Sequence, residues 1–260
     1  MTERPRFLAI GAHPDDVEFL CAGTLALLVE AGFDAVIASM SPGNLGSAVL
    51  GESSVAQVRR QEATNAVRLL GGRYVCVEAR DFQIFFGDEL CRRTTALIRS
   101  VRPQVVFTHA RVDYLADHEE TARIVAQACF AAPVPHYRTE GFFAGGERPT
   151  DAIAHLYYCD PVELQDLFGR PVQPGLYVDI SSSLDLKLQM LACHESQREW
   201  LGKHHGTDDY LATMQRWGMT RGAEVGVEYA EGFHQHKGHA YPTTCLLSSV
   251  LAERVLRADT

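Results

Sequence analysis

No part of the sequence is apolar enough to cross a membrane. Among its 260 residues, no stretch approaches the roughly 20 consecutive apolar residues that a membrane-spanning helix needs. The opening residues, MTERPRFLAIGAHPDD, also lack the long apolar region and the small-residue cleavage site of a signal peptide. We therefore expect a cytoplasmic protein that has no membrane partner.

Paired cysteines and an excess of positive charge are missing as well. The seven cysteines are scattered and include no C-x-x-C pair, which argues against a disulfide framework or a zinc knuckle. The 24 lysines and arginines are outnumbered by 33 aspartates and glutamates, so the formal net charge is −9. Without a basic stripe to neutralise phosphates, nucleic acid is not an expected partner.

Two nucleotide-binding motifs are also absent. The segment SPGNLGS, residues 41–47, lacks the lysine of a P-loop. The segment GAHPDD, residues 11–16, stands where a dinucleotide-binding protein would carry G-x-G-x-x-G. The sequence therefore argues against a nicotinamide-dependent enzyme.

The first half of the chain alternates between strand patterns and helix patterns. Short apolar runs predict strands, and amphipathic spacing with terminal glycine or proline predicts helices. This alternation predicts a Rossmann-like α/β fold, with a mostly parallel sheet covered by helices on both faces. Ligands of such sheets bind at the carboxyl ends of the strands. The predicted strands are 6–13, 34–44, 73–79 and 104–110, and the predicted helices are 17–32, 53–72, 88–103 and 117–132.

From about residue 132 the pattern becomes irregular. Residues 132–151 are rich in proline and glycine and predict a surface loop. Further on, 155–160 and 176–181 predict strands, 183–201 and 207–222 predict helices, and 227–242 is a histidine-rich segment. With no repeat or clear linker, we expect residues 1–260 to form a single domain with an irregular C-terminal elaboration.

The turn after the first predicted strand carries an imidazole and two adjacent carboxylates, His13, Asp15 and Asp16. Zinc binds imidazole nitrogen and carboxylate oxygen, and catalytic zinc sites usually have three protein ligands and one open position. His13 and Asp16 can supply two ligands, while Asp15 remains free to act as a base, and a cation would offset the repulsion between the carboxylates. In the alternative interpretation, Pro14 presets the turn and Asp15 caps the next helix, with no metal involved.

A second polar cluster, HARVDYLADHEE at residues 109–120, follows the fourth predicted strand. It offers His109, Asp113, Asp117 and His118. We favour His118 as the third metal ligand because it opens a helix and can project over the sheet edge, whereas His109 can simply form a hydrogen bond at the strand end. Two such clusters at the ends of parallel strands favour the metal site over the simple turn.

These motifs resemble one known family. AHPDD and the downstream D-x-x-x-DH, with VRRQEATNAVRLLG between them, are similar to the LmbE-like (PIG-L type) zinc-dependent N-acetylglucosaminyl deacetylases. YVDISSSLDLKLQMLACHESQ and RGAEVGVEYAEGF extend the likeness over nearly the whole chain. The resemblance implies Zn²⁺ held by His13, Asp16 and His118, with Asp15 as general base in the hydrolysis of an acetamido group on a sugar. It also implies a homo-oligomer.

The chain departs from the commoner family pattern HPDH, because it reads LADH at residues 115–118. The first histidine, an expected oxyanion partner, is therefore replaced by Leu115. The segment GFHQHKGH offers substitutes, of which we choose His236 as a catalytic residue ahead of His239 and His234. In some relatives a C-terminal histidine, even one from a neighbouring subunit, completes the site. The competing interpretation is that these histidines are only solvated.

Four further residues are candidates for supporting roles. Asp117 can orient a ligand imidazole or cap its helix. Asp113 can orient Asp15 or meet a sugar hydroxyl. By resemblance Arg59 reaches the active site, although a surface ion pair accounts for it equally well. His194, in CHESQ, matches a family motif, although a lone helical histidine is more often structural. We assign Arg59, Asp113 and His194 to substrate binding.

The sequence thus predicts a metal-dependent hydrolase that removes the N-acetyl group from an N-acetylglucosamine-type sugar or conjugate. Zn²⁺ is the expected metal, and Fe²⁺ suits the same ligand set. One alternative is a related amidase acting on a different acyl-amino conjugate. The other is a non-catalytic binding protein that retains the metal. Leu115 keeps this last alternative open, whereas Asp15 argues against it.

Overall fold

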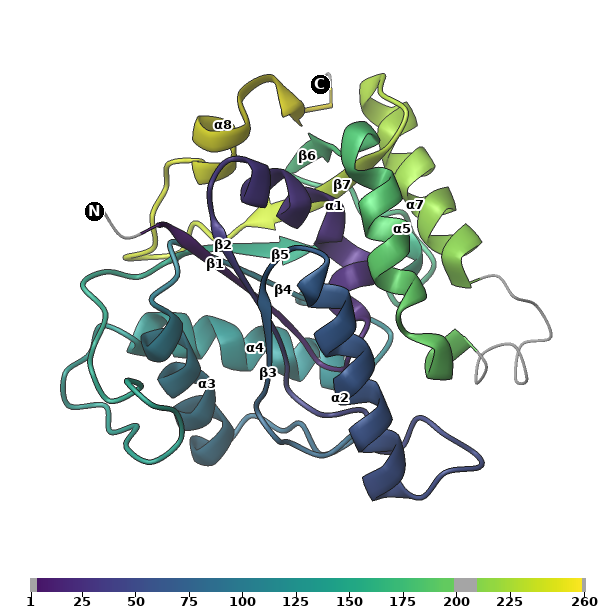
Figure 1. The fold of residues 1–260 in the computed structure, drawn as a ribbon. Coiled ribbons are helices and arrows are strands. Elements are labelled where there is room, and N and C mark those ends of the chain that lie inside the picture. The colour runs from purple at the N-terminus through teal and green to yellow at the C-terminus, as the bar shows by residue number, and fades with distance from the viewer. Residues whose placement is uncertain (1–3, 199–209, 259–260) are drawn as a thin grey trace.

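One eight-stranded sheet organises the protein (Figure 1). The computed structural model describes residues 4–198 and 210–258. The strand order is β3-β2-β1-β4-β5-β7-β6-β8, in which the pairs from β3 to β5 are parallel and the later pairs are antiparallel. The strands are β1 (Arg6–Gly11), β2 (Asp34–Ser39), β3 (Arg73–Cys76), β4 (Val105–Thr108), β5 (His155–Cys159), β6 (Leu176–Asp179), β7 (Ala230–Gln235) and β8 (Val255–Leu256).

Helices cover both faces of this sheet. In Figure 1, α3 and α4 lie against one face, while α1, α5 and α7 lie together on the other side. The longer helices are α1 (Asp16–Glu30), α2 (Glu52–Arg68), α3 (Asp88–Val101), α4 (Ala116–Ala131), α5 (Leu184–Ala192) and α7 (Tyr210–Val225), and α8 (Leu246–Leu251) follows β7. The predicted Rossmann-like α/β class is confirmed. No helix within the described ranges is long and apolar enough to span a membrane.

The central strands are apolar on both sides because each side packs against a helical layer. In β1, Phe7 and Ala9 belong to the core cluster that contains α1 residues, whereas Leu8 and Ile10 belong to the cluster that contains α3 and α4 residues. Successive side chains of a strand point to opposite faces, so a strand buried on both faces reads as a continuous apolar run. This is why RFLAIG could be assigned to a strand from sequence.

The C-terminal half differs from the prediction at one important place. The histidine-rich segment 227–242, for which we predicted no element, contains β7, and β7 joins the sheet antiparallel to both β5 and β6. The predicted helices 183–201 and 207–222 correspond to α5 and α7, with residues 199–201 and 207–209 lying outside the described part of the chain. The reversed direction of β7 determines where its histidines lie.

Candidate metal and active site

Two neighbouring parallel strands bring the predicted clusters together. β1 and β4 pair in parallel, so their carboxyl ends meet at one edge of the sheet. His13 lies two residues beyond β1, and α1 begins at Asp16. His118 lies in the first turn of α4, which follows β4 after a short loop. Segments about a hundred residues apart in the chain therefore converge at this edge.

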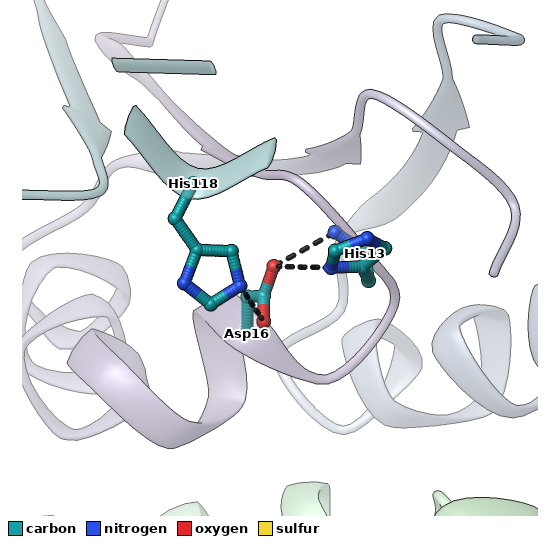
Figure 2. A group of neighbouring side chains, drawn as sticks. All are labelled: His13, Asp16 and His118. Atoms are coloured by element: carbon teal, nitrogen blue, oxygen red, sulfur yellow. Dashed lines mark hydrogen bonds and ion pairs between the residues drawn. The ribbon is translucent and has the colours of Figure 1, made fainter. Parts of the chain in front are cut away.

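His13, Asp16 and His118 form a compact group of metal-ligating side chains. One possible ligand atom from each lies within 4.8 Å of the others. Figure 2 shows the Asp16 carboxylate between the two rings, 3.6 Å from His13 Nδ1 and 3.6 Å from His118 Nε2. Two ligands of a tetrahedral Zn²⁺ lie about 3.4 Å apart, so the donor types and spacing fit that ion.

The other nitrogen of each imidazole faces a carboxylate. His13 Nε2 lies 3.2 Å from Asp117 Oδ2, and His118 Nδ1 lies 3.1 Å from Asp113 Oδ1. Such outer carboxylates fix the orientation of a ligand imidazole and increase its basicity. Asp117 is therefore placed as predicted. We had considered two roles for Asp113, to orient Asp15 or to meet a sugar hydroxyl. Its fully buried side chain lies against His118 instead.

His109 forms the strand-end contact that we had considered for it. Its Nε2 lies 2.9 Å from the amide nitrogen of Ala12 and 3.0 Å from Asp16 Oδ2. Its ring stacks on that of His118 with 4.0 Å between centroids. Together with Asp113 and His118, His109 makes a second group of possible ligands, but one that shares His118 with the first. His109 therefore packs behind Asp16 and His118 and belongs to the same site.

The charges of this group favour a bound cation. Burial lowers the pKa of His13, but the contacts with Asp117 and Asp16 outweigh burial and raise it to about 10. Burial raises the pKa of Asp16, but His118 and His109 hold it well below its usual range. The carboxylates at this edge of the sheet thus stabilise positive charge on His13 and His118, whose pKa values are both raised despite burial. A divalent cation would satisfy the same demand.

Asp15 is held apart from the ligand group in a strained conformation. Its φ of 99° is in the left-handed region, which a non-glycine residue adopts only at a cost. It occupies the cap position of α1 but makes no capping hydrogen bond among the described residues, so the simple helix-cap interpretation fails. Instead, Arg59 Nη2 donates to its Oδ1 at 3.2 Å and the Tyr210 hydroxyl donates to its Oδ2 at 2.6 Å.

The carboxyl group of Asp15 is largely buried beside Arg59. Burial raises the pKa of Asp15, and the neighbouring Arg59 offsets this effect only in part. Arg59 is itself buried and also donates to the carbonyl of Pro14 at 2.5 Å. The sequence motif indicated Arg59, whereas Tyr210 was missed because it lies 195 residues from Asp15 along the chain.

A cavity of about 610 Å³ opens onto these residues. Its lining includes His13, Asp15, Asp16, Arg59 and His118. This volume lies within the about 300–1,000 Å³ that is typical of small-molecule sites. The cavity therefore gives a ligand access to the possible metal ligands and to the proposed base together.

The structure does not bring His236 to this cavity. β7 runs antiparallel to β5, so its end lies beside the amino end of β5, at the sheet edge opposite the site. The His236 amide donates to the carbonyl of Leu156 at 2.8 Å, and its ring Nδ1 lies 2.8 Å from the Tyr158 hydroxyl. We had chosen His236 as the catalytic substitute for the missing histidine, and the position of β7 excludes this role within one chain. His234, on β7, is likewise not among the residues that line the cavity.

His194, which we had assigned to substrate binding, does not reach the cavity. Its side chain is fully buried, with Nε2 3.4 Å from Glu18 Oε1. From the same CHESQ motif, Gln197 does line the cavity and donates to the carbonyl of Gly46 at 3.2 Å. Leu115 also lines it, and the histidines among its described lining residues are His13 and His118 alone. No histidine of the described residues replaces the missing one.

Asp113 gives a test of this arrangement. Asp113→Asn is expected to weaken metal binding about 10–100-fold, because removing the outer carboxylate frees the His118 ring and lowers its basicity. Competition with a chromogenic chelator would measure the affinity. The control Asp88→Asn alters an exposed carboxylate on α3 and should leave the affinity unchanged. Equal affinities for Asp113→Asn and the unsubstituted protein would show that Asp113 does not act through His118.

Comparisons with known proteins find similarity to one family of deacetylases. The family model described as "PIG-L: GlcNAc-PI de-N-acetylase" matches residues 8–129, a range that holds both polar clusters and Arg59. The chain is 25% identical over 240 residues to the diacetylchitobiose deacetylase of Thermococcus kodakarensis, covering 87% of this chain and 81% of that protein. It is 26% identical over 242 residues to the 1D-myo-inositol 2-acetamido-2-deoxy-alpha-D-glucopyranoside deacetylase of Actinosynnema mirum, covering 76% and 82%.

Solved structures share the fold. The N,N'-diacetylchitobiose deacetylase of Pyrococcus horikoshii matches with a TM-score of 0.74 and 24% identity, over 93% of this chain and 88% of that one. GalB, the 4-carboxy-2-hydroxymuconate hydratase of Pseudomonas putida KT2440, matches with a TM-score of 0.73 and 22% identity, over 93% and 100%. The names of these two proteins describe different reactions. The fold alone therefore does not determine the chemistry.

Proposed function

We propose that this chain, whose residues 8–129 carry the PIG-L (LmbE-like) family domain, is a zinc-dependent hydrolase that removes the N-acetyl group from an N-acetylglucosamine-type sugar or conjugate. The family resemblance predicted from the motifs is confirmed, and its sequence relatives are deacetylases and amidases. One observation carries the proposal: His13, Asp16 and His118 converge beside Asp15 in a single open cavity.

The ligand residues would hold the metal and leave room for solvent and substrate. His13, Asp16 and His118 supply three donors, the usual number for a catalytic zinc site. When bound, the metal supplies Lewis acidity, which lowers the pKa of a water molecule and polarises an amide carbonyl. Asp117 and Asp113 hold the two imidazoles in place. The protein thus presents a fixed ligand set at the base of the cavity.

Asp15 would move the proton during hydrolysis. As a carboxylate it accepts a proton from the attacking water, and it then delivers this proton to the nitrogen that leaves as the sugar amine. Arg59 and Tyr210 fix its two oxygens, so the base is aimed before substrate arrives. Leu115 cannot donate a hydrogen bond to the carbonyl oxygen. Stabilisation of the developing oxyanion would therefore depend more on the cation than in relatives that have a histidine there.

Acetate release tests the function directly. We expect the zinc-loaded protein to release acetate from N-acetylglucosamine glycosides, detected with the product amine by mass spectrometry, and a chelator to abolish this activity. Elemental analysis of protein purified without oxygen would distinguish zinc from iron. Full metal occupancy without release from a broad acetamido-sugar panel would contradict the proposal and favour a metal-retaining binding protein. Release of a different acyl group would identify the related amidase. A homo-oligomer and a cytoplasmic location stay predictions.

A further inference from the structure

Two aromatic side chains line the cavity yet remain largely exposed. Phe82 is 64% exposed and Tyr114 is 66% exposed, and both belong to the cavity lining. Phe82 has a φ of 59°, a left-handed conformation that is unusual for a bulky residue. Backbone strain of this kind persists only where the surrounding structure enforces it, and it is concentrated at functional sites. The cavity edge thus displays an apolar ring at a cost in conformational energy.

Both aromatic residues are tied to the metal-ligating group. The Phe82 amide donates to Asp117 Oδ2 at 2.7 Å, and this same oxygen lies 3.2 Å from His13 Nε2. The Tyr114 ring meets that of His118 edge to face, with 5.4 Å between centroids and an interplanar angle of 89°. Phe82 is therefore held next to His13 through Asp117, and Tyr114 is held next to His118 by direct contact.

The rest of the lining mixes apolar side chains with polar ones such as Gln197, Thr213 and Arg216. Phe19 and Trp217 pack together with 4.8 Å between ring centroids and line one side, contributed by α1 and α7. Leu115 and Val162 add aliphatic surface from the loops after β4 and β5. A cavity of about 610 Å³ has room for more than a single sugar ring. The C–H face of one sugar ring can cover one aromatic ring, but it is too small to cover the apolar surface of Phe19, Phe82, Tyr114 and Trp217 together.

We propose that the substrate carries an apolar substituent, alkyl or aryl, which packs on Phe82 and Tyr114 while the amide lies at the metal-ligating group. This inference rests on the proposed function and names the substrate class more narrowly: an amphiphilic acetamido sugar. Flat and aliphatic groups both gain from contact with aromatic faces, and burial of the substituent removes apolar area from water. The substituent is either the aglycone or an extended acyl chain, and these two sources make the same contact.

Substrate series measure the contribution of these rings. For the zinc-loaded protein we expect kcat/KM for phenyl or octyl N-acetyl-β-glucosaminide to exceed that for the methyl glycoside about tenfold. A second arm compares N-acetyl with N-butanoyl in the methyl glycoside. Phe82→Ala and Tyr114→Ala should remove most of the preference seen in whichever arm shows it. Tyr114→Phe keeps the ring and should retain the preference.

Phe85 provides the matched control. It lies in the same loop and is also 64% exposed, but it does not line the cavity, so Phe85→Ala should leave the preference unchanged. Hydrolysis of all glycosides at equal kcat/KM would overturn this inference and leave the deacetylase function standing. If no glycoside is hydrolysed, titration calorimetry of phenyl and methyl β-glucosaminide still tests the inference, because it compares the affinities of the two compounds. Tighter binding of the phenyl compound that Phe82→Ala abolishes supports the inference, and equal binding overturns it.

Discussion

Asp15→Asn is expected to lower kcat for acetate release about 10²–10⁴-fold while the metal stays bound. The amide cannot accept the proton of the attacking water, so the substitution removes the base and keeps the shape of the side chain. The asparagine oxygen can still accept from Arg59, and the Tyr210 hydroxyl can accept from its NH₂ group where it now donates to Asp15. The structure around residue 15 is therefore expected to survive the change.

Asp16→Asn separates the two adjacent carboxylates. Asp16 supplies a possible ligand oxygen, and its Oδ2 also accepts the His13 amide at 2.7 Å. Its substitution should lower zinc content and kcat together, whereas Asp15→Asn should lower kcat alone. Zinc content by elemental analysis and kcat by mass spectrometry, measured on the same preparations, give both values. Full turnover by Asp15→Asn, or metal loss from it comparable to that of Asp16→Asn, would contradict the assigned roles.

The sequence was sufficient to predict that His13, Asp16 and His118 lie together, because their proximity depends on simple regularities. Each cluster follows an apolar run, and parallel strands bring their carboxyl ends to one edge of the sheet. The alternation of strands and helices predicted that the sheet would be parallel. The sequence alone therefore predicts that the two polar clusters lie at the same edge of the sheet.

The supporting contacts could not be predicted in the same way. Asp113 orients His118 rather than Asp15 because of the path of the loop between β4 and α4. Tyr210 reaches Asp15 through the packing of α7 beside α1, where its ring lies 5.3 Å from that of Phe19. Such contacts depend on three-dimensional packing between distant segments. No local pattern in the sequence encodes them.

The error at His236 has a specific physical origin. The segment AEGFHQ contains a glycine and no β-branched residue, so its intrinsic strand preference is weak. Its pairing with β5 and β6 stabilises the strand, since the flanking strands supply partners for its backbone groups on both sides. Once the segment is a strand antiparallel to β5, His236 must lie at the edge opposite the cavity. A strand that was missed thus led us to place a proposed catalytic residue at the wrong edge of the sheet of its own chain.

Arg99→Met is expected to destabilise the protein by about 3–5 kcal/mol, the largest effect on stability that we predict. The Arg99 side chain, from α3, is 1% exposed. Its guanidinium donates to neutral oxygens at the end of α4 and in the segment that follows, which has no helix or strand before β5. These acceptors are the carbonyls of Ala131, Ala132, Val134, Tyr137 and Glu147 and the hydroxyl of Thr139.

The expected loss is large because the acceptors stay in place when the cation is removed. Methionine fills part of the volume but offers no donor, so several carbonyls near position 99 lose their partner. Arg102 is the matched control: it donates to the Pro149 carbonyl and pairs with Asp151, but its side chain is 35% exposed. Arg102→Met should therefore cost no more than about 1 kcal/mol. Urea unfolding, with midpoints compared at equal slope, measures both, and equal losses would show that burial of Arg99 does not account for its effect.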